Sequence, residues 1–505
     1  MDPLKPLLTR LDSFLEAQNR LVYRYDAGLA VELPRAALRA GAPDFGRIES
    51  LLAVTEASEA RRTEDADRIF FRALRPFLAE EVLHARADHA EEEIHALEAQ
   101  QEVTFGGEIL PFREARYSLP LEPSHEKRVL NANAMSAFLL AHRGPYARRA
   151  EAAIEGFRAL GFETGAAYRE AFLGEKDAER IIDDAQSLLR STEDAYRDVL
   201  GYVLKRVDPA LRGLPNGTAG LVDVAAAGVA TALLNALPPR EGPETLTRWL
   251  LEWGFHPGGE GNLRLDSEER PGKSAAPFVH AVRVPQEIRM GVRPGNGGIP
   301  EYVDVARAYG EALRLGALPS EAGLTERRLY DARVPAAYGA LFALALGQAG
   351  WHRRYRGASK PQAREAARLL AFFELFNLRR VAAEALYHLN LESRGPGPVL
   401  ADDYAGRLES VLYVRAPKGH FLERARLGLS LGDALRSRAL GAGLATMLER
   451  RFDEDFFRNP AASSWLKASF RSLEREDAAR LDQQLGPAPA TLTHAGARTV
   501  RVLGA

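Results

Sequence analysis

The 505-residue sequence contains no cysteine. Disulfides, thiolate nucleophiles, cysteine-ligated zinc and iron–sulfur clusters are therefore excluded. The sequence also has no long apolar run. The best candidate, residues 221–237, is rich in alanine and glycine and includes Asp223, a composition typical of a buried helix and not of a membrane span.

An excess of positive charge is missing as well, because 67 Lys and Arg residues face 69 Asp and Glu residues. Proteins that grip nucleic acid or anionic membranes usually carry a clear basic excess, so we expect neither partner. The first twenty residues are polar and charged and lack the apolar stretch of a signal peptide. The expected compartment is the cytoplasm.

Helical periodicity dominates the chain. Apolar residues recur three and four positions apart through most of it, with long examples at 48–100 and 361–392. The exception is a Gly- and Pro-rich region at 256–300, where two runs, 278–284 and 288–292, are typical of β-strands. We expect a mainly α protein with a small β-sheet near residues 278–293. The last twenty residues, rich in Pro, Ala and Thr, predict a loose tail.

Residues 262–315 are the most informative segment: NLRLDSEERPGKSAAPFVHAVRVPQEIRMGVRPGNGGIPEYVDVARAYGEALRL. This segment, together with FFELFNLRRVAAEALYHLNLE at 372–392 and FDEDFFRNPAASSWLKASF at 452–470, resembles the thimet-oligopeptidase and oligoendopeptidase-F-like zinc peptidases. The resemblance implies a gluzincin-type, two-lobed clamshell with a central groove. It also implies an N-terminal helical lobe at 1–205, a zinc-peptidase-like lobe at 206–485 and the tail at 486–505.

The positions that carry chemistry in that family differ here. The family holds zinc with a His-Glu-x-x-His helix and a later Glu, and stabilises the oxyanion with tyrosines on a late helix. This sequence has no His-Glu-x-x-His. By the resemblance, the two His, the base, the third ligand and the tyrosines fall on Ala306, Gly310, Arg307, Ala336, Leu435 and Ala439. A guanidinium is no base at neutral pH, and we expect Gly310 and Ala336 to leave space without ligand atoms. No catalytic residue, metal or cofactor is therefore expected.

The resemblance also implies where a peptide would bind. In the family, an edge strand pairs with an extended substrate. The corresponding groups here are Ile288, Arg289, Met290, Gly291, Tyr302, Arg307, Tyr309 and Tyr338. The alternative is that the three tyrosines pack helices and that Arg307 pairs with a neighbouring carboxylate.

Other chemistry has little support. Glu384, His388 and Glu392 have i, i+4, i+8 spacing on one predicted helix, which suits either a replacement metal site or a paired polar stripe. There is no G-x-S-x-G, and Gly272-Lys273-Ser274 lacks the rest of a P-loop.

These observations leave three hypotheses. The first is a non-catalytic pseudopeptidase that binds a peptide, or that regulates or scaffolds an active metallopeptidase paralogue as a heterodimer. The second is an enzyme with different chemistry, or a different metal site, in the same groove. The third is a structural interaction protein whose groove has closed.

Overall fold

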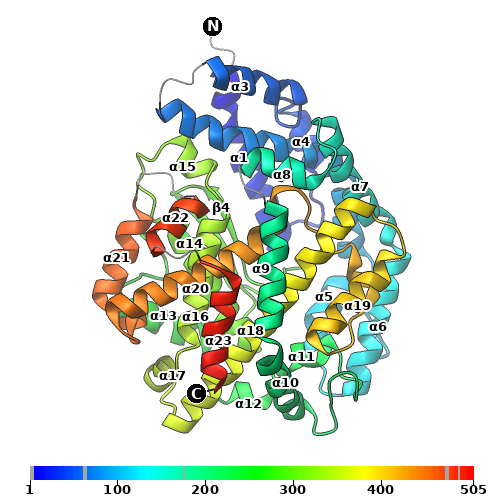
Figure 1. Ribbon diagram of the computed structural model, residues 1–505, viewed down its shortest axis with the longest axis vertical. Helices are drawn as coiled ribbons and strands as arrows, with labels where there is room; N and C mark the ends of the chain where they lie inside the picture. Colours follow the sequence, from blue (N-terminus) through cyan, green and yellow to red (C-terminus); the bar gives the residue numbers. More distant parts are fainter. Residues whose placement is uncertain (1–4, 61–64, 174–176, 473–476, 487–489, 505) are drawn as a thin grey trace.

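Helices stack around a small central sheet in the structure, a computed structural model that describes residues 5–60, 65–173, 177–472, 477–486 and 490–504 (Figure 1). The expectation of a mainly α protein is confirmed. None of the described helices has the length and the apolar run needed to cross a membrane.

The elements of the N-terminal part include one β-hairpin. They are α1 (Lys5–Asp26), α2 (Arg35–Ala40), α3 (Ile48–Ala60), α4 (Asp65–Gln100), β1 (Glu102–Phe105), β2 (Glu108–Pro111), α5 (Phe112–Ser118), η1 (Leu119–Leu121), α6 (His125–Ala141), α7 (Arg143–Ala159), α8 (Gly165–Leu173), α9 (Asp177–Ser191) and α10 (Glu193–Val207). The hairpin was not expected from the sequence.

The second part holds the central sheet and the long helices. Its elements are α11 (Leu221–Ala227), α12 (Thr231–Leu234), α13 (Gly242–Trp253), β3 (Leu263–Asp266), β4 (Phe278–Arg283), β5 (Glu287–Gly291), α14 (Gly298–Gly316), α15 (Leu324–Arg328), α16 (Arg333–Leu346), α17 (Ala349–Tyr355), α18 (Lys360–Arg394), α19 (Leu400–Leu412), η2 (Lys418–Phe421), η3 (Gly428–Gly432), α20 (Asp433–Phe452), η4 (Phe456–Arg458), α21 (Pro460–Phe470), α22 (Ala478–Leu485) and α23 (Leu492–Gly504).

Local signals set the ends of the longest of these helices. Ser359 caps the start of α18 in a capping box, because its own N–H and hydroxyl donate to Gln362 Oε1 at 2.9 and 2.8 Å. The helix stops at Gly395, whose φ of 75° is left-handed and favours glycine.

Two hydrophobic clusters organise the molecule. The main one runs from Ile94 to Leu503 and joins segments on both sides of residue 205, for example where Tyr196 stacks on Phe372 at 5.7 Å between ring centroids. The smaller one is formed mostly by α1, α3 and the first part of α4. We call residues 5–83 together with α8 the N-terminal cap, and the rest the body. A lobe boundary at residue 205 stays a prediction.

The C-terminal segment is a helix, so the expectation of a loose tail at 486–505 is wrong for its described residues; 487–489 and 505 lie outside them. Helix α23 packs on α9, α18 and α20, with Leu492 fully buried. Arg498 pairs with Glu449, and Thr446 Oγ1 bonds His494 Nε2 at 2.9 Å. Its apolar face and these polar contacts outweigh the low helix propensity of its threonines and glycine.

We expect Leu492→Ala to lower the free energy of unfolding by about 2–5 kcal/mol, because it removes a fully buried side chain from the α23 interface. Urea unfolding followed by circular dichroism measures this. Arg501→Ala, at an exposed position of the same helix, is the control and should change stability by less than about 0.5 kcal/mol. Equal, small effects of both variants would contradict docking of α23.

Candidate functional site

Helix α14 is held in a fixed position at its start. The loop after β5 turns into the helix through glycines, and the buried carboxylate of Glu301 accepts hydrogen bonds from the N–H groups of Gly295 (3.0 Å), Gly297 (2.7 Å) and Gly242 (3.2 Å). The segment that resembles the family's zinc-binding helix is therefore a rigid part of the body.

Gly310 does not leave an empty space, so that expectation is wrong. A Cβ atom built on Gly310 would lie 2.5 Å from the carbonyl oxygen of Tyr338 and 2.8 Å from Gly339 Cα. In return, a Cβ on Gly339 would lie 2.8 Å from the carbonyl oxygen of Arg307. Small residues at a helix crossing let the backbones approach, and here α14 and α16 touch. A metal-binding side chain at position 310 has no room.

Helix α20 packs against the other side of α16. A Cβ on Gly441 would lie 2.5 Å from Ala340 Cβ, so these two helices are also in close contact. Ala306, Leu435 and Ala439 are buried, and Ala336 is half-buried. Within the described ranges, no group of three or more His, Cys, Asp or Glu side chains is placed to hold a metal ion.

The side chain of Arg307 points away from that contact, toward α18. Its Nη2 lies 3.8 Å from Glu374 Oε2, and Glu374 Oε1 accepts a hydrogen bond of 2.9 Å from Arg438 of α20. Burial raises the pKa of Asp304, one turn earlier, while Arg307 and Arg438 act to lower it. This pairing matches the alternative in which Arg307 neutralises a neighbouring carboxylate.

The cavity beside Arg307 is small. It has a volume of about 60 Å³, enough for water but not for a peptide, and its walls come from α14, α16, α18 and α23. Arg498 of α23 is part of its lining. The groove expected at this position is therefore filled by helices.

The expectation that β5 is an edge strand is also wrong, because β5 is the central strand. The order is β3-β5-β4, with Ile288 opposite Leu263 in the parallel pair and Met290 opposite Val279 in the antiparallel pair. Both backbone edges are occupied, so Ile288, Arg289, Met290 and Gly291 offer no edge to a peptide.

The three tyrosines pack between helices instead of lining a groove. Tyr302 donates to the carbonyl of Pro238 at 3.0 Å, and Tyr338 bonds Ser469 Oγ at 2.7 Å. Tyr309 is buried too, and its burial raises its pKa to about 12.

The α18 set does not form a metal site. Glu384 accepts from Arg380 at 2.8 Å, and both carboxylate oxygens of Glu392 accept from Arg169 Nη1 at 2.8 Å. His388 is buried between them, and burial lowers its pKa to about 4, although Glu384 opposes this. Each carboxylate already has a cationic partner.

A larger cavity lies between the cap and the body. It has a volume of about 330 Å³ and is lined by α4, α8, residues 328–333, the start of α20 and α22. We call it the interlobe cavity. Its polar lining includes Glu80, Arg328, Tyr330, Asp331, Arg333 and Asp433. No sequence motif pointed to it, because its walls come from segments that lie far apart in the chain.

The interlobe cavity holds charges of both signs. Burial raises the pKa of Asp433 to about 7, with Arg333 opposing and Asp331 reinforcing the shift. Burial also raises the pKa of Glu80, although Leu429 N–H (2.9 Å) and Tyr168 OH (2.8 Å) donate to its carboxylate. Arg328, almost wholly buried, has no hydrogen-bond partner at Nη2.

Comparison with solved structures agrees with this architecture. A protein assigned as an oligoendopeptidase F matches with a TM-score of 0.65 and 11% identity, over 99% of this chain and 91% of its own. Trypanosoma cruzi metallocarboxypeptidase 1 matches with a TM-score of 0.56 and 12% identity, over 98% and 99%. Oligoendopeptidase-F from Enterococcus faecium matches with a TM-score of 0.50 and 12% identity, over 99% and 96%.

No protein-family model and no curated protein matches the sequence. The structural matches define the class: the chain has the fold of the oligopeptidase-like metallopeptidases. The expected fold is therefore confirmed. Sequence identities this low are evidence for the fold and for nothing further.

We expect Gly310→Ala to destabilise the protein by about 1–3 kcal/mol, because the added methyl group meets the backbone of α16. Denaturant unfolding tests this. The matched control is Gly406→Ala on α19, where nothing lies within 4 Å; it should stabilise the protein by up to about 1 kcal/mol. A neutral or stabilising Gly310→Ala would show that the helices do not touch.

Asp433 should make stability depend on pH. Its pKa of about 7 in the folded state exceeds the unfolded value near 4, so the folded state holds the proton more tightly. Its contribution is then fully present below about pH 4 and is lost as the pH rises through about 7.

Asp433→Asn should remove this loss. We expect the variant to gain stability relative to the wild type as the pH rises from about 4 to about 8 in urea unfolding. Asp402→Asn, at an exposed position, serves as the control. A difference between Asp433→Asn and wild type that is constant with pH would refute the assignment.

Proposed function

We propose that the chain is a non-catalytic relative of the oligopeptidase-like metallopeptidases that binds a short peptide in the interlobe cavity. The contact of Gly310 with Tyr338 and Gly339 is the observation that supports the absence of catalysis. Zinc peptidases activate water with a metal and a base, and this contact leaves no room for a ligand at the position where the resemblance puts one.

The charges of the interlobe cavity support the proposal that a peptide binds there. A volume of about 330 Å³ is at the lower end of the range for small-ligand sites, which suits a few residues of peptide. Asp433 and Glu80 are placed to meet an ammonium group. Arg328 and Arg333, which line the same cavity, supply positive charge opposite a carboxylate. A peptide with free ends carries both groups.

Metal content and cleavage test the loss of catalysis. We expect the purified protein to bind no stoichiometric zinc and to leave a library of fluorescence-quenched peptides uncut, with or without added zinc. Zinc at one equivalent, together with cleavage that a chelator abolishes, would overturn the non-catalytic proposal.

Peptide binding has its own test. A mixture of di- to tetrapeptides with free ends should raise the melting temperature of the wild type. Ser430→Trp places an indole inside the cavity and should abolish this shift, whereas Ser410→Trp, at an exposed position of α19, should retain it. Absence of a wild-type shift, or its persistence in Ser430→Trp, would remove the cavity as the binding site.

A further inference from the structure

One face of α4 forms a wall of the interlobe cavity. The residues that line the cavity from this helix follow the helical period: Arg72, Ala73, Pro76, Phe77, Glu80, Glu81 and His84. The side chain of Arg72 is 66% exposed, whereas Glu80 is half-buried. The helix rises about 12 Å between these two residues, which is the length of about three to four extended peptide residues. Along this wall the lining changes from cationic, through apolar, to anionic.

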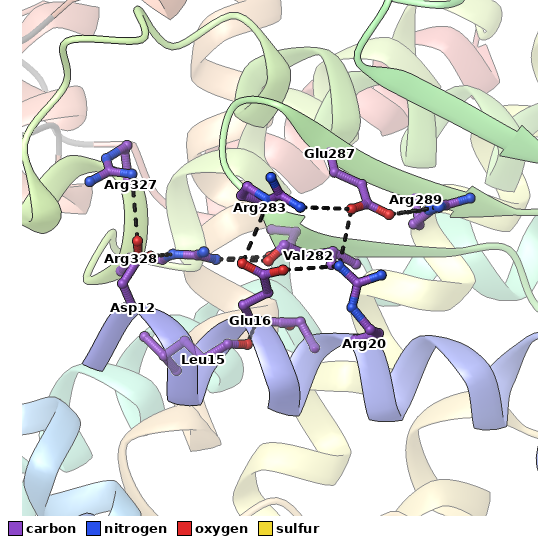
Figure 2. Close-up of polar contacts among 12 residues, drawn as sticks. Asp12, Leu15, Glu16, Arg20, Val282, Arg283, Glu287, Arg289, Arg327 and Arg328 are labelled. Carbon is purple, nitrogen blue, oxygen red and sulfur yellow. Dashed lines mark hydrogen bonds and ion pairs between the residues drawn. The ribbon is translucent and has the colours of Figure 1, made fainter. Parts of the chain in front are cut away.

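The arginines in the other walls already have carboxylate partners. Arg328 Nε pairs with Asp12 of α1, and its Nη1 donates to the carbonyl of Val282 at 3.1 Å (Figure 2). Arg333 donates to both carboxylate oxygens of Asp331, at 2.9 and 2.8 Å. A carboxylate of the ligand therefore gains less from these two guanidinium groups than it would from unpaired ones.

Glu80 is placed differently, because its hydrogen-bond partners are neutral. Its Oε1 accepts from the N–H of Leu429 at 2.9 Å and from the hydroxyl of Tyr168 at 2.8 Å. His84, one turn further along α4, bonds Glu81 at 3.3 Å. Among the residues that the structure describes, no Lys or Arg forms an ion pair with Glu80.

Asp433 is a second carboxylate at the same place. It begins α20, four residues after Leu429, and the charge of Glu80 acts to raise its pKa. Its Oδ1 lies 3.8 Å from Nε of Arg333, a guanidinium that already binds Asp331. Two carboxylates thus line the cavity without a hydrogen-bonded cation, and an ammonium group between them would relieve their repulsion.

An apolar wall adjoins these carboxylates. Phe77 precedes Glu80 by three residues, so their side chains are neighbours on the helix surface, about 5–6 Å apart at Cβ. Leu429, whose N–H binds Glu80, also lines the cavity, as do Phe172 and Leu173 of α8. The side chain next to an ammonium group at Glu80 would therefore meet apolar groups.

We propose that the interlobe cavity recognises the amino end of a peptide, with its ammonium group between Glu80 and Asp433, an apolar first side chain against Phe77 and Leu429, and the following residues directed along α4 toward Arg72. This rests on the proposed function, because it states which part of a peptide that cavity selects. The carboxyl end is the weaker determinant.

Four tripeptides test the proposal by isothermal titration calorimetry at about pH 7.5, where Asp433 is mostly ionised and more than half of the amino ends keep their proton. Phe-Ala-Ala should bind at least about tenfold more tightly than its isomer Ala-Ala-Phe, which has the same composition and free ends but no aromatic ring beside the ammonium group. Acetylation of the amino end of Phe-Ala-Ala should weaken binding at least about tenfold, because it removes the charge. Amidation of its carboxyl end should weaken binding by less than about threefold.

Glu80→Gln separates recognition from a structural role. Glutamine keeps an oxygen that can accept from Leu429 and Tyr168 but carries no charge, so the cost of acetylation should fall below about threefold. A purely structural role of Glu80 would leave this ratio unchanged. Glu170→Gln, at an exposed position of α8, is the matched control and should keep the wild-type ratio.

The peptide series needs no variant, so the proposal can fail even where Glu80→Gln does not fold. Equal affinity of the wild type for Phe-Ala-Ala and its acetylated form, or for the two isomers, would overturn it. In that case the Ser430→Trp variant still decides whether peptides bind in the cavity at all. If none of the four peptides binds the wild type, this proposal and peptide binding by the cavity are both wrong.

Discussion

The contact between α14 and α16 at Gly310 and Gly339 is the constraint on which the rest of the site depends. Because the backbones touch there, position 310 has no room for a side chain, and Glu311 of α14 lies against Gly339 of α16. The side chain of Arg307 extends away from this contact, toward Glu374 on α18. Helix α20 presses on the far side of α16 through Gly441. The three helices that resemble the zinc-binding centre of a peptidase thus form a packed layer.

Buried arginines do much of the cross-linking in a chain that has no disulfides. Arg379 is fully buried and donates to the carbonyls of Val411 (2.8 Å) and Leu189 (2.8 Å), as well as to Glu193 (2.7 Å). Arg128 is bound in the same manner to Asp223, at 2.8 Å. A planar guanidinium with five donors can satisfy several chain segments at once, which suits positions where loops meet long helices. Arg328, in a wall of the interlobe cavity, is bound in a similar manner to Asp12 and to the carbonyl of Val282 at 3.1 Å.

The sequence predicted what depends on local pattern. Strands β4 and β5 lie within one residue of the expected runs 278–284 and 288–292, and the periodic stretch 361–392 lies within α18, because alternation and helical period are local signals. The strand order was not predictable in the same way. The third strand, β3, is four residues long and does not alternate in burial, and it is this strand that makes β5 central.

Two site features also depend on partners that are distant in the sequence. Gly310 looked like a vacancy because a glycine gives no hint of the helix that fills its space. The tail looked loose because proline and threonine have low helix propensity, although α9, α18 and α20 together form an apolar surface on which α23 packs. In both cases the sequence does not show which helices pack against the segment: α16 against Gly310, and α9, α18 and α20 against α23.

The two cavities, one beside Arg307 and one between cap and body, differ in size and in charge. The catalytic position implied by the resemblance is closed on one side by α16 and on another by α23, and retains about 60 Å³. The interlobe cavity retains about 330 Å³ and carries groups of both charges. Apolar side chains that filled that cavity would give a more stable folded state, since buried charges rarely stabilise a fold as well as hydrophobic packing does. Partly neutralised carboxylates and the arginines Arg328 and Arg333 line that cavity, whereas the backbones of α14 and α16 touch at the position where the resemblance puts a metal ligand. The charged groups that a ligand can meet are therefore in the interlobe cavity and not at the position that the resemblance implies for catalysis.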